Sequence, residues 1–211
     1  MGTISALRSN DRKKQIDVFI DGLFSFTIAD ELAVTNRLEV GRRLSIDQIE
    51  KLKEANLFKS CLDAAIHYLS YRPRSENEVR QRLRRRRFDG NIIEEVITRL
   101  KERQLIDDLA FAEYWRNNRL SFSPRSRRLI KLELRQKGVA AETANQVLNN
   151  LDDENSVYEA GLRKVRRFSG SDYEDFRQGL YDYLRRRGFD YVTIKTAVER
   201  LWQDRKKVIY K

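Results

Sequence analysis

Three short stretches of similar sequence decide the fold: Leu83-RRRR-Phe88, Leu134-RQKG-Val139 and Leu184-RRRG-Phe189. Their leading leucines lie 51 and 50 residues apart. Apolar residues recur four positions before each leucine, and eight, nine and twelve positions after the last residue of each stretch. Such spacings belong to one face of a helix and not to a strand. The chain therefore contains an internal repeat of about fifty residues that is built from helices.

Each repeat is predicted to hold three helices. One helix ends near the basic run, and a tight turn leads into a second helix of about a dozen residues. Gly138 and Gly188 suit the left-handed residue that ends a helix, whereas the first repeat has Arg87 there. Periodic apolar residues predict a further helix before each pair, over 61–69, 109–119 and about 156–167. The expected fold class is mainly α, with three tandem three-helix repeats forming an elongated helical array.

The N-terminal part of the chain differs from the rest. Gln15–Ile20 and Leu23–Ile28 are rich in β-branched and aromatic residues and flank Asp21-Gly22, which predicts a β-hairpin. Every second residue from Phe24 to Ile28 should then lie on one face. A third strand is expected over Thr3–Arg8, because an isolated hairpin is marginally stable.

Ser45 is the predicted N-cap of a helix that follows this strand-rich head. We divide the chain into the head over 1–58 and three repeats over 59–108, 109–154 and 155–211. The head is either a folding cap for the helical body or a surface that contacts a partner, and the sequence leaves both open.

The charge is unevenly distributed. The net charge is +11, and residues 60–211 carry 33 basic against 23 acidic residues. Such an excess favours a polyanionic partner, although an acidic protein surface would also fit. A single cysteine excludes an internal disulfide. With no signal-like or membrane-spanning apolar run, we expect a cytoplasmic monomer that does not contact a membrane.

The basic residues cluster on the same element of each repeat, where arginine predominates. Its planar fork suits bidentate contact with phosphate or carboxylate, although any single arginine could equally be solvated with its stem on apolar surface. We expect the three stretches to line one concave binding face. The candidate binding residues are Arg72, Arg74, Arg80, Arg84, Arg87, Arg119, Arg125, Arg127, Arg128, Lys131, Arg135, Lys137, Arg185, Arg186 and Arg187. Tyr181 takes the place of Arg80 and Lys131 in the third repeat and could stack on a base.

No pattern of residues indicates catalysis. Asp107-Asp108 and Asp152-Asp153 precede predicted helices, so N-capping explains them better than a metal or catalytic pair. The chain contains no phosphate-binding glycine loop, nucleophile elbow or zinc spacing. We therefore expect no enzymatic activity, no cofactor and no metal. We interpret Cys61 and His67 as packing residues of the core or its boundary, and Trp115 and Trp202, which fall on apolar helical stripes, as core residues.

The sequence resembles the RecX family of recombinase regulators along essentially its whole length. The closest stretch is Gln104-LIDDLAFAEYWRNNR-Leu120, followed by Arg125-SRRLIKLELRQKG-Val139, and the first repeat adds Tyr71-RPRSENEVRQR-Leu83. Two positions depart from the family, because Arg87 and Ser123-Pro124 stand where glycine is usual.

The resemblance implies a fold of three tandem three-helix repeats. It also implies a negative regulator that binds the RecA filament on single-stranded DNA and restrains its ATPase, strand-exchange and coprotease activities. Two alternatives stay open from the residues alone. The first is a stand-alone DNA- or RNA-binding helical protein, such as a helix-turn-helix regulator. The second is a scaffold whose charge serves only solubility.

Overall fold

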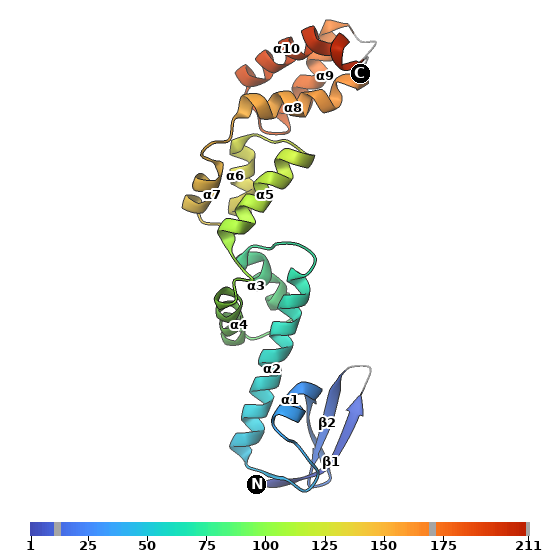
Figure 1. The fold of residues 1–211 in the computed structure, drawn as a ribbon, viewed down its shortest axis with the longest axis vertical. Helices are drawn as coiled ribbons and strands as arrows, with labels where there is room; N and C mark the ends of the chain where they lie inside the picture. Colours follow the sequence, from blue (N-terminus) through green and yellow to red (C-terminus); the bar gives the residue numbers. More distant parts are fainter. Residues whose placement is uncertain (11–13, 169–171, 210–211) are drawn as a thin grey trace. The chain divides into compact units, whose positions relative to one another are not determined.

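A computed structural model describes residues 1–10, 14–168 and 172–209 (Figure 1). Part of the predicted third repeat, at 169–171 and 210–211, lies outside the described residues. The described chain is mainly helical and has a small antiparallel sheet at its N-terminal end, as predicted. It divides into two compact units, the first comprising residues 1–71 and 80–102 and the second residues 72–79 and 103–211.

The sheet of the first unit contains the predicted hairpin. Strands β1 (Gly2–Asn10), β2 (Gln15–Ile20), β3 (Leu23–Ala29) and β4 (Arg43–Leu44) lie in the order β3-β2-β1-β4. Asp21 and Gly22 have φ of 49° and 83°, as a tight Asp-Gly turn requires. The short helix α1 (Asp30–Thr35) and strand β4 were not predicted, because neither has enough residues to show a periodic pattern.

A β-bulge changes which face of the hairpin Phe24 occupies. Val18 pairs with Phe26, but the next residue, Phe19, pairs with Phe24, so Ser25 is an extra residue in β3. Phe24 is 58% exposed and contacts Phe19 at a centroid distance of 5.9 Å. The predicted alternation is therefore correct for Phe26 and Ile28, which are buried, and wrong for Phe24.

One long helix, α2 (Ile46–Leu69), follows the head. Ser45 caps it as predicted, and Gln48 completes a capping box with it. The separate helix predicted over 61–69 is wrong, because no glycine or proline interrupts the segment and a single helix continues through it. The predicted boundary between residues 58 and 59 consequently falls inside α2.

Two sets of three helices in the second unit each surround their own core. Helices α5 (Asp108–Phe122), α6 (Arg127–Gln136) and α7 (Ala141–Leu148) share one core. Helices α8 (Asp153–Val165), α9 (Tyr173–Arg185) and α10 (Tyr191–Ile209) share another, and the short 3-10 helix η1 (Arg166–Phe168) follows α8. The repeat-defining residues Ile130, Leu134, Leu180 and Leu184 are fully buried.

The remaining helices, α3 (Glu76–Arg85) and α4 (Gly90–Glu102), form the pair of the first repeat, and α3 contributes residues to both units. Val79 and Leu83 are fully buried, as their equivalents in the other repeats are. The basic runs thus lie at the C-terminal ends of α3, α6 and α9, where the sequence placed them.

Similar hydrogen bonds join successive repeats at two places. At the first junction, residues 72–79 meet the turn at 137–138, and Ser75 Oγ donates to the Lys137 carbonyl at 2.6 Å. At the second junction, residues 121–129 meet the turn at 186–188, and Ser126 N donates to the Arg187 carbonyl at 3.0 Å. Asp108 accepts from Glu76 N at 2.9 Å, and Asp153 accepts from Arg127 N at 2.7 Å.

Close approach explains why glycine ends α6 and α9. Gly138 and Gly188 have φ of 82° and 87°, as predicted. A Cβ on Gly138 would lie 2.4 Å from Asn77 Cβ, and one on Gly188 would lie 2.6 Å from Ser126 Oγ. Arg87 also has a left-handed φ, of 64°, but its side chain is exposed, so strain is its main cost.

Glu78 neutralises the first junction. Its carboxylate accepts from Arg72 Nη2 at 2.9 Å and from Lys137 Nζ at 2.8 Å, and its backbone N–H is capped by Ser75. Burial alone would raise the pKa of Glu78, but the hydrogen bonds from Arg72 and Lys137 outweigh burial. The pKa consequently lies below its ordinary value of 4.5.

Arg87→Gly should stabilise the protein. Relief of the left-handed strain, about 1 to 2 kcal/mol, exceeds the entropic cost of glycine, about 0.5 to 1 kcal/mol, so the free energy of unfolding should rise by about 0.5 to 1 kcal/mol. Urea denaturation measures the change. Arg86→Gly is the matched control, because it removes the same charge from an exposed neighbour outside the left-handed region. Equal effects of the two substitutions would contradict the strain at Arg87.

Glu78→Gln should lower the free energy of unfolding by about 1 to 2 kcal/mol at neutral pH, because it weakens two charged hydrogen bonds. The stabilisation by Glu78 is complete above its unfolded pKa and is lost as pH falls through its lower folded pKa. The difference between wild type and variant, measured by urea denaturation, should therefore shrink below about pH 4.5.

The control for this experiment is Glu102→Gln, which removes an ion pair whose side chains are 49% and 58% exposed. It should change stability by less than about 0.5 kcal/mol. A Glu78→Gln deficit that stays constant down to pH 3 would refute the role assigned to the carboxylate.

Candidate nucleic-acid interface

Several of the candidate cations form ion pairs with carboxylates of the protein itself. Arg72 and Lys137 bind Glu78 at the first junction. Arg80 of α3 forms an ion pair with Glu94 of α4. The charge of each of these residues is already partly neutralised by a carboxylate of the protein. They are therefore poorer ligands for an external anion than the sequence suggested.

Two more candidate cations, Arg119 and Arg125, form ion pairs with Glu133. Its side chain is buried, accepts from Arg119 Nε at 2.7 Å and forms an ion pair with Arg125. Trp115 Nε1 donates to the same carboxylate at 2.7 Å. Sequence reasoning missed this role of Glu133. The position of Glu133 one residue before Leu134, at the border of the apolar stripe of α6, could have indicated that its carboxylate is buried.

Trp115 is a boundary residue and not a pure core residue. Its ring packs against the core of α5–α7 on one side. The cationic groups of Arg119 and Lys137 each lie 4.2 Å from its centroid. Such cation–π contacts hold both side chains in place and reduce their freedom to reach a ligand.

Helix α6 presents the least compensated basic surface of the described helices. Its four candidate cations are exposed, and the only acid in its sequence, Glu133, is buried and bonded to Arg119 and Arg125. No acid stands in its first turn, whereas α3 has Glu76 and Glu78 there. Cations near a helix N-terminus are disfavoured by the helix dipole, and here the Asp153 carboxylate of α8, which accepts from Arg127 N, offsets part of that cost. The cations further along α6 stay available to an external anion. The four cations are Arg127, Arg128, Lys131 and Arg135.

The other basic runs contribute exposed arginines as well. Arg84 and Arg87 are exposed at the end of α3. Arg185 and Arg186 are exposed at the end of α9, where Arg185 lies 3.9 Å from Asp182. Among the candidates not yet described, Arg187, which stacks on Tyr183, and Arg74, at the position equivalent to Arg125, are half-buried. The predicted single concave face of all three runs stays a prediction.

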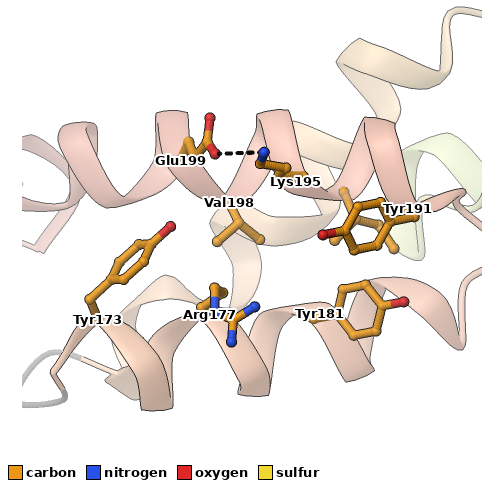
Figure 2. Close-up of a pocket in the computed structure, with 8 residues that line it drawn as sticks. Tyr173, Arg177, Tyr181, Tyr191, Lys195, Val198 and Glu199 are labelled. Atoms are coloured by element: carbon orange, nitrogen blue, oxygen red, sulfur yellow. Dashed lines mark ion pairs between the residues drawn. The ribbon is translucent and has the colours of Figure 1, made fainter.

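Tyr181 lines a hollow between α9 and α10, which Figure 2 shows in close-up. Its ring meets that of Tyr191 at a centroid distance of 5.9 Å, and Tyr191 is 60% exposed. The two cations of this hollow pair with acids of the same helices, Arg177 with Glu174 and Lys195 with Glu199. The hollow is therefore nearly neutral, and the exposed face of α6 is the better candidate for binding a polyanion.

Asp107 and Asp152 cap the helices that follow them, as predicted, whereas Asp108 and Asp153 lie within α5 and α8 and accept from Glu76 N and Arg127 N of the preceding repeat. Asp107 caps α5 through Leu109 N at 2.8 Å, and Asp152 caps α8 through Glu154 N at 2.8 Å. Within residues 1–10, 14–168 and 172–209, no group of three or more His, Cys, Asp or Glu residues could hold a metal ion.

The three remaining packing predictions have different outcomes. Trp202 is half-buried and packs against the core of α8–α10, with its ring centroid 5.1 Å from that of Phe176. Cys61 is buried, and burial raises the pKa of its thiol to about 11, which makes it unreactive at neutral pH. His67 is exposed and contacts Tyr71, so the packing role predicted for it is wrong.

Among the residues that the structure describes, no helix combines the length and apolarity needed to cross a bilayer.

Comparison with known proteins places these features in one family. The models of the first and second three-helix domains of RecX match residues 61–100 and 107–148. The "Regulatory protein RecX" of Lactobacillus gasseri is 30% identical over 95% of this chain and 75% of its own length. That of a Listeria monocytogenes strain is 29% identical over 92% of this chain and 73% of its own length.

Solved structures agree with this assignment. The crystal structure of a regulatory protein RecX matches with a TM-score of 0.67 at 22% identity, covering 94% of this chain and all of the other, and supports the fold. RecX from Lactobacillus salivarius matches with a TM-score of 0.58 at 29% identity, covering 70% of this chain and 97% of the other. Repeats of three helices, basic runs on the same element of each repeat and these similarities together lead to one conclusion: the chain belongs to the RecX family of regulatory proteins.

Proposed function

We propose that this protein binds the RecA filament assembled on single-stranded DNA and restrains its ATPase, strand-exchange and coprotease activities, thereby modulating DNA repair and recombination. It acts by binding alone, as a cytoplasmic monomer without enzymatic activity or cofactor. Membership of a family of regulatory proteins supports this proposal. The proposed architecture is three tandem three-helix repeats, and the two cores of the second unit support it.

The observation that carries the proposal is the exposed cationic face of α6. A filament presents DNA phosphates and acidic protein side chains together, and arginine forms bidentate contacts with both. Because the only acid of α6 is buried, Arg128, Lys131 and Arg135 keep their full charge available to such a partner. The exposed arginines that end α3 and α9 would extend the contact to neighbouring filament subunits.

The test is the ATPase of the recombinase on single-stranded DNA, titrated with this protein and with the α6 variant Arg128→Glu/Lys131→Glu/Arg135→Glu. All three side chains are exposed, so the variant should keep its melting temperature. Losing three charged contacts should raise the concentration for half-inhibition at least about tenfold. The matched control is Arg99→Glu/Lys101→Glu/Arg103→Glu, which makes the same change in net charge at exposed positions of α4 and the loop after it.

Each outcome is decisive. Full inhibition by a folded α6 variant would remove α6 from the contact surface. Equal loss in the α6 variant and the control would attribute the effect to net charge and not to this face. Tight binding of wild type to DNA beside an unaffected ATPase would overturn the proposal in favour of a stand-alone nucleic-acid-binding protein.

A further inference from the structure

In both repeat junctions an N-cap serine donates to a carbonyl of the turn and an aspartate accepts from the first N–H of the helix, but the two junctions differ in charge. Glu78 stands three residues after the N-cap Ser75 at the first junction, and Leu129 stands three residues after the N-cap Ser126 at the second. Lys137, which Glu78 neutralises, corresponds to Arg187 in the next repeat. The second junction therefore keeps the cation and lacks the carboxylate that pairs with it.

The carboxylate of Glu133 also has no counterpart one repeat later, where the equivalent residue is Tyr183. Glu133, which binds Arg119 and Arg125, lies one residue before Leu134, and Tyr183 lies one residue before Leu184. The Tyr183 ring is buried and has the Arg187 guanidinium 3.8 Å and Lys164 Nζ 5.1 Å from its centroid. The ring face attracts these cations without cancelling their charge.

Arg187 consequently lies in a strongly positive environment. Its Nε–H is buried and has no hydrogen-bond partner among the residues that the structure describes. Burial lowers the pKa of Arg187. Tyr183 opposes this shift, and the charges of Arg125, Arg186 and Arg163 add to it. Arg163 is itself anchored, because its Nη2 donates to the Ser121 carbonyl at 2.7 Å.

This arrangement is costly unless an anion compensates it. Buried donors are nearly always bonded, and like charges held together destabilise a fold. The cluster joins three elements, namely the loop before α6, helix α8 and the end of α9. Among the described residues, the carboxylate bonded to it is that of Glu133, through Arg125. Arg127 and Arg128 follow Ser126 directly, so the cluster is continuous along the chain with the exposed cations of α6.

We propose that the second junction is a phosphate-binding site for the backbone of a nucleic acid, with Arg187, Arg186 and Arg163 as its ligands. The guanidinium of Arg187, oriented by its stacking on Tyr183, offers donors to a phosphate oxygen. The inference deepens the proposed function by naming where this protein contacts the strand. A phosphodiester and a free phosphate ion share this chemistry, and the test below separates them.

The decisive variant is Leu129→Glu, which gives the second junction the carboxylate of the first. Ser126 N already donates to the Arg187 carbonyl, so the introduced carboxylate is available to the cations of the junction, as that of Glu78 is to Arg72 and Lys137. Leu129 is only half-buried, which favours a folded variant. The measurement is the anisotropy of a fluorescein-labelled single-stranded thymidine oligonucleotide, without recombinase, over a series of KCl concentrations.

Wild type should show a linear fall of the logarithm of the binding constant with the logarithm of salt concentration. Leu129→Glu should weaken binding about tenfold and reduce the slope by at least about 0.7, the value for one phosphate contact on a single strand. Arg187→Met, which keeps an apolar side chain on Tyr183, should give a similar loss of slope. Melting curves confirm that both variants are folded.

The matched control is Val192→Glu, an apolar-to-glutamate exchange at a 71% exposed position of α10. It should leave the salt slope unchanged. An unchanged slope in both junction variants, or an equal loss in the control, overturns the site. Competition by millimolar inorganic phosphate at constant ionic strength, with the same slope in all variants, would overturn nucleic-acid specificity and identify a free phosphate ion as the ligand.

The recombinase ATPase assay keeps the two proposals separate. If wild type binds the oligonucleotide through the junction and leaves the ATPase unaffected, the proposed function fails while the phosphate site stands. If wild type suppresses the ATPase and Leu129→Glu leaves the oligonucleotide slope unchanged, the phosphate site fails while the proposed function stands.

Discussion

The close seating of a glycine turn on the N-cap serine of the preceding repeat is the contact on which the helical part of this protein depends. It needs a left-handed residue without a Cβ, because the turn lies against the first turn of the preceding repeat's helix. A Cβ on Gly138 would meet Asn77, two residues after the N-cap Ser75, and a Cβ on Gly188 would meet the N-cap Ser126 itself. The turn, the cap and the start of the next helix are thereby held together, so each basic run is fixed to its repeat and the core can close behind it.

The two junctions have the same arrangement of turn and helix start, and a few side chains set the charge of each repeat. Carboxylates at positions 78 and 133 neutralise the cations of the first junction and of the second repeat's interior. One repeat later in each case, Leu129 and Tyr183 stand at these places, so Arg187 at the second junction has neither carboxylate beside it. A protein that must bind a polyanion benefits from this division, because one part is made rigid by internal pairs and another keeps charge for the ligand.

In the third repeat an aromatic ring covers the helix surface that corresponds to the seat of Gly188 on α6. Gly179 corresponds to Leu129, and a Cβ there would lie 2.5 Å from the Phe168 ring. The aromatic ring of Phe168 thus covers a surface that receives Gly188 in the second repeat. Helix α9 also begins about one turn earlier than α6 relative to the buried leucines, and it has 13 residues against 10 in α6.

The sequence by itself determined the repeat, the helix pairs, the left-handed turns, the Asp-Gly hairpin and the basic run of each repeat. These features depend on spacing along the chain and on backbone preferences, which are local properties. Only the tertiary structure decided which arginines are available, because Glu78 and Lys137 are 59 residues apart and meet only when two repeats dock. The exposure of Phe24 was decided in the same way. A bulge of one residue reverses a face, and pairing between strands creates it without a pattern in either strand alone.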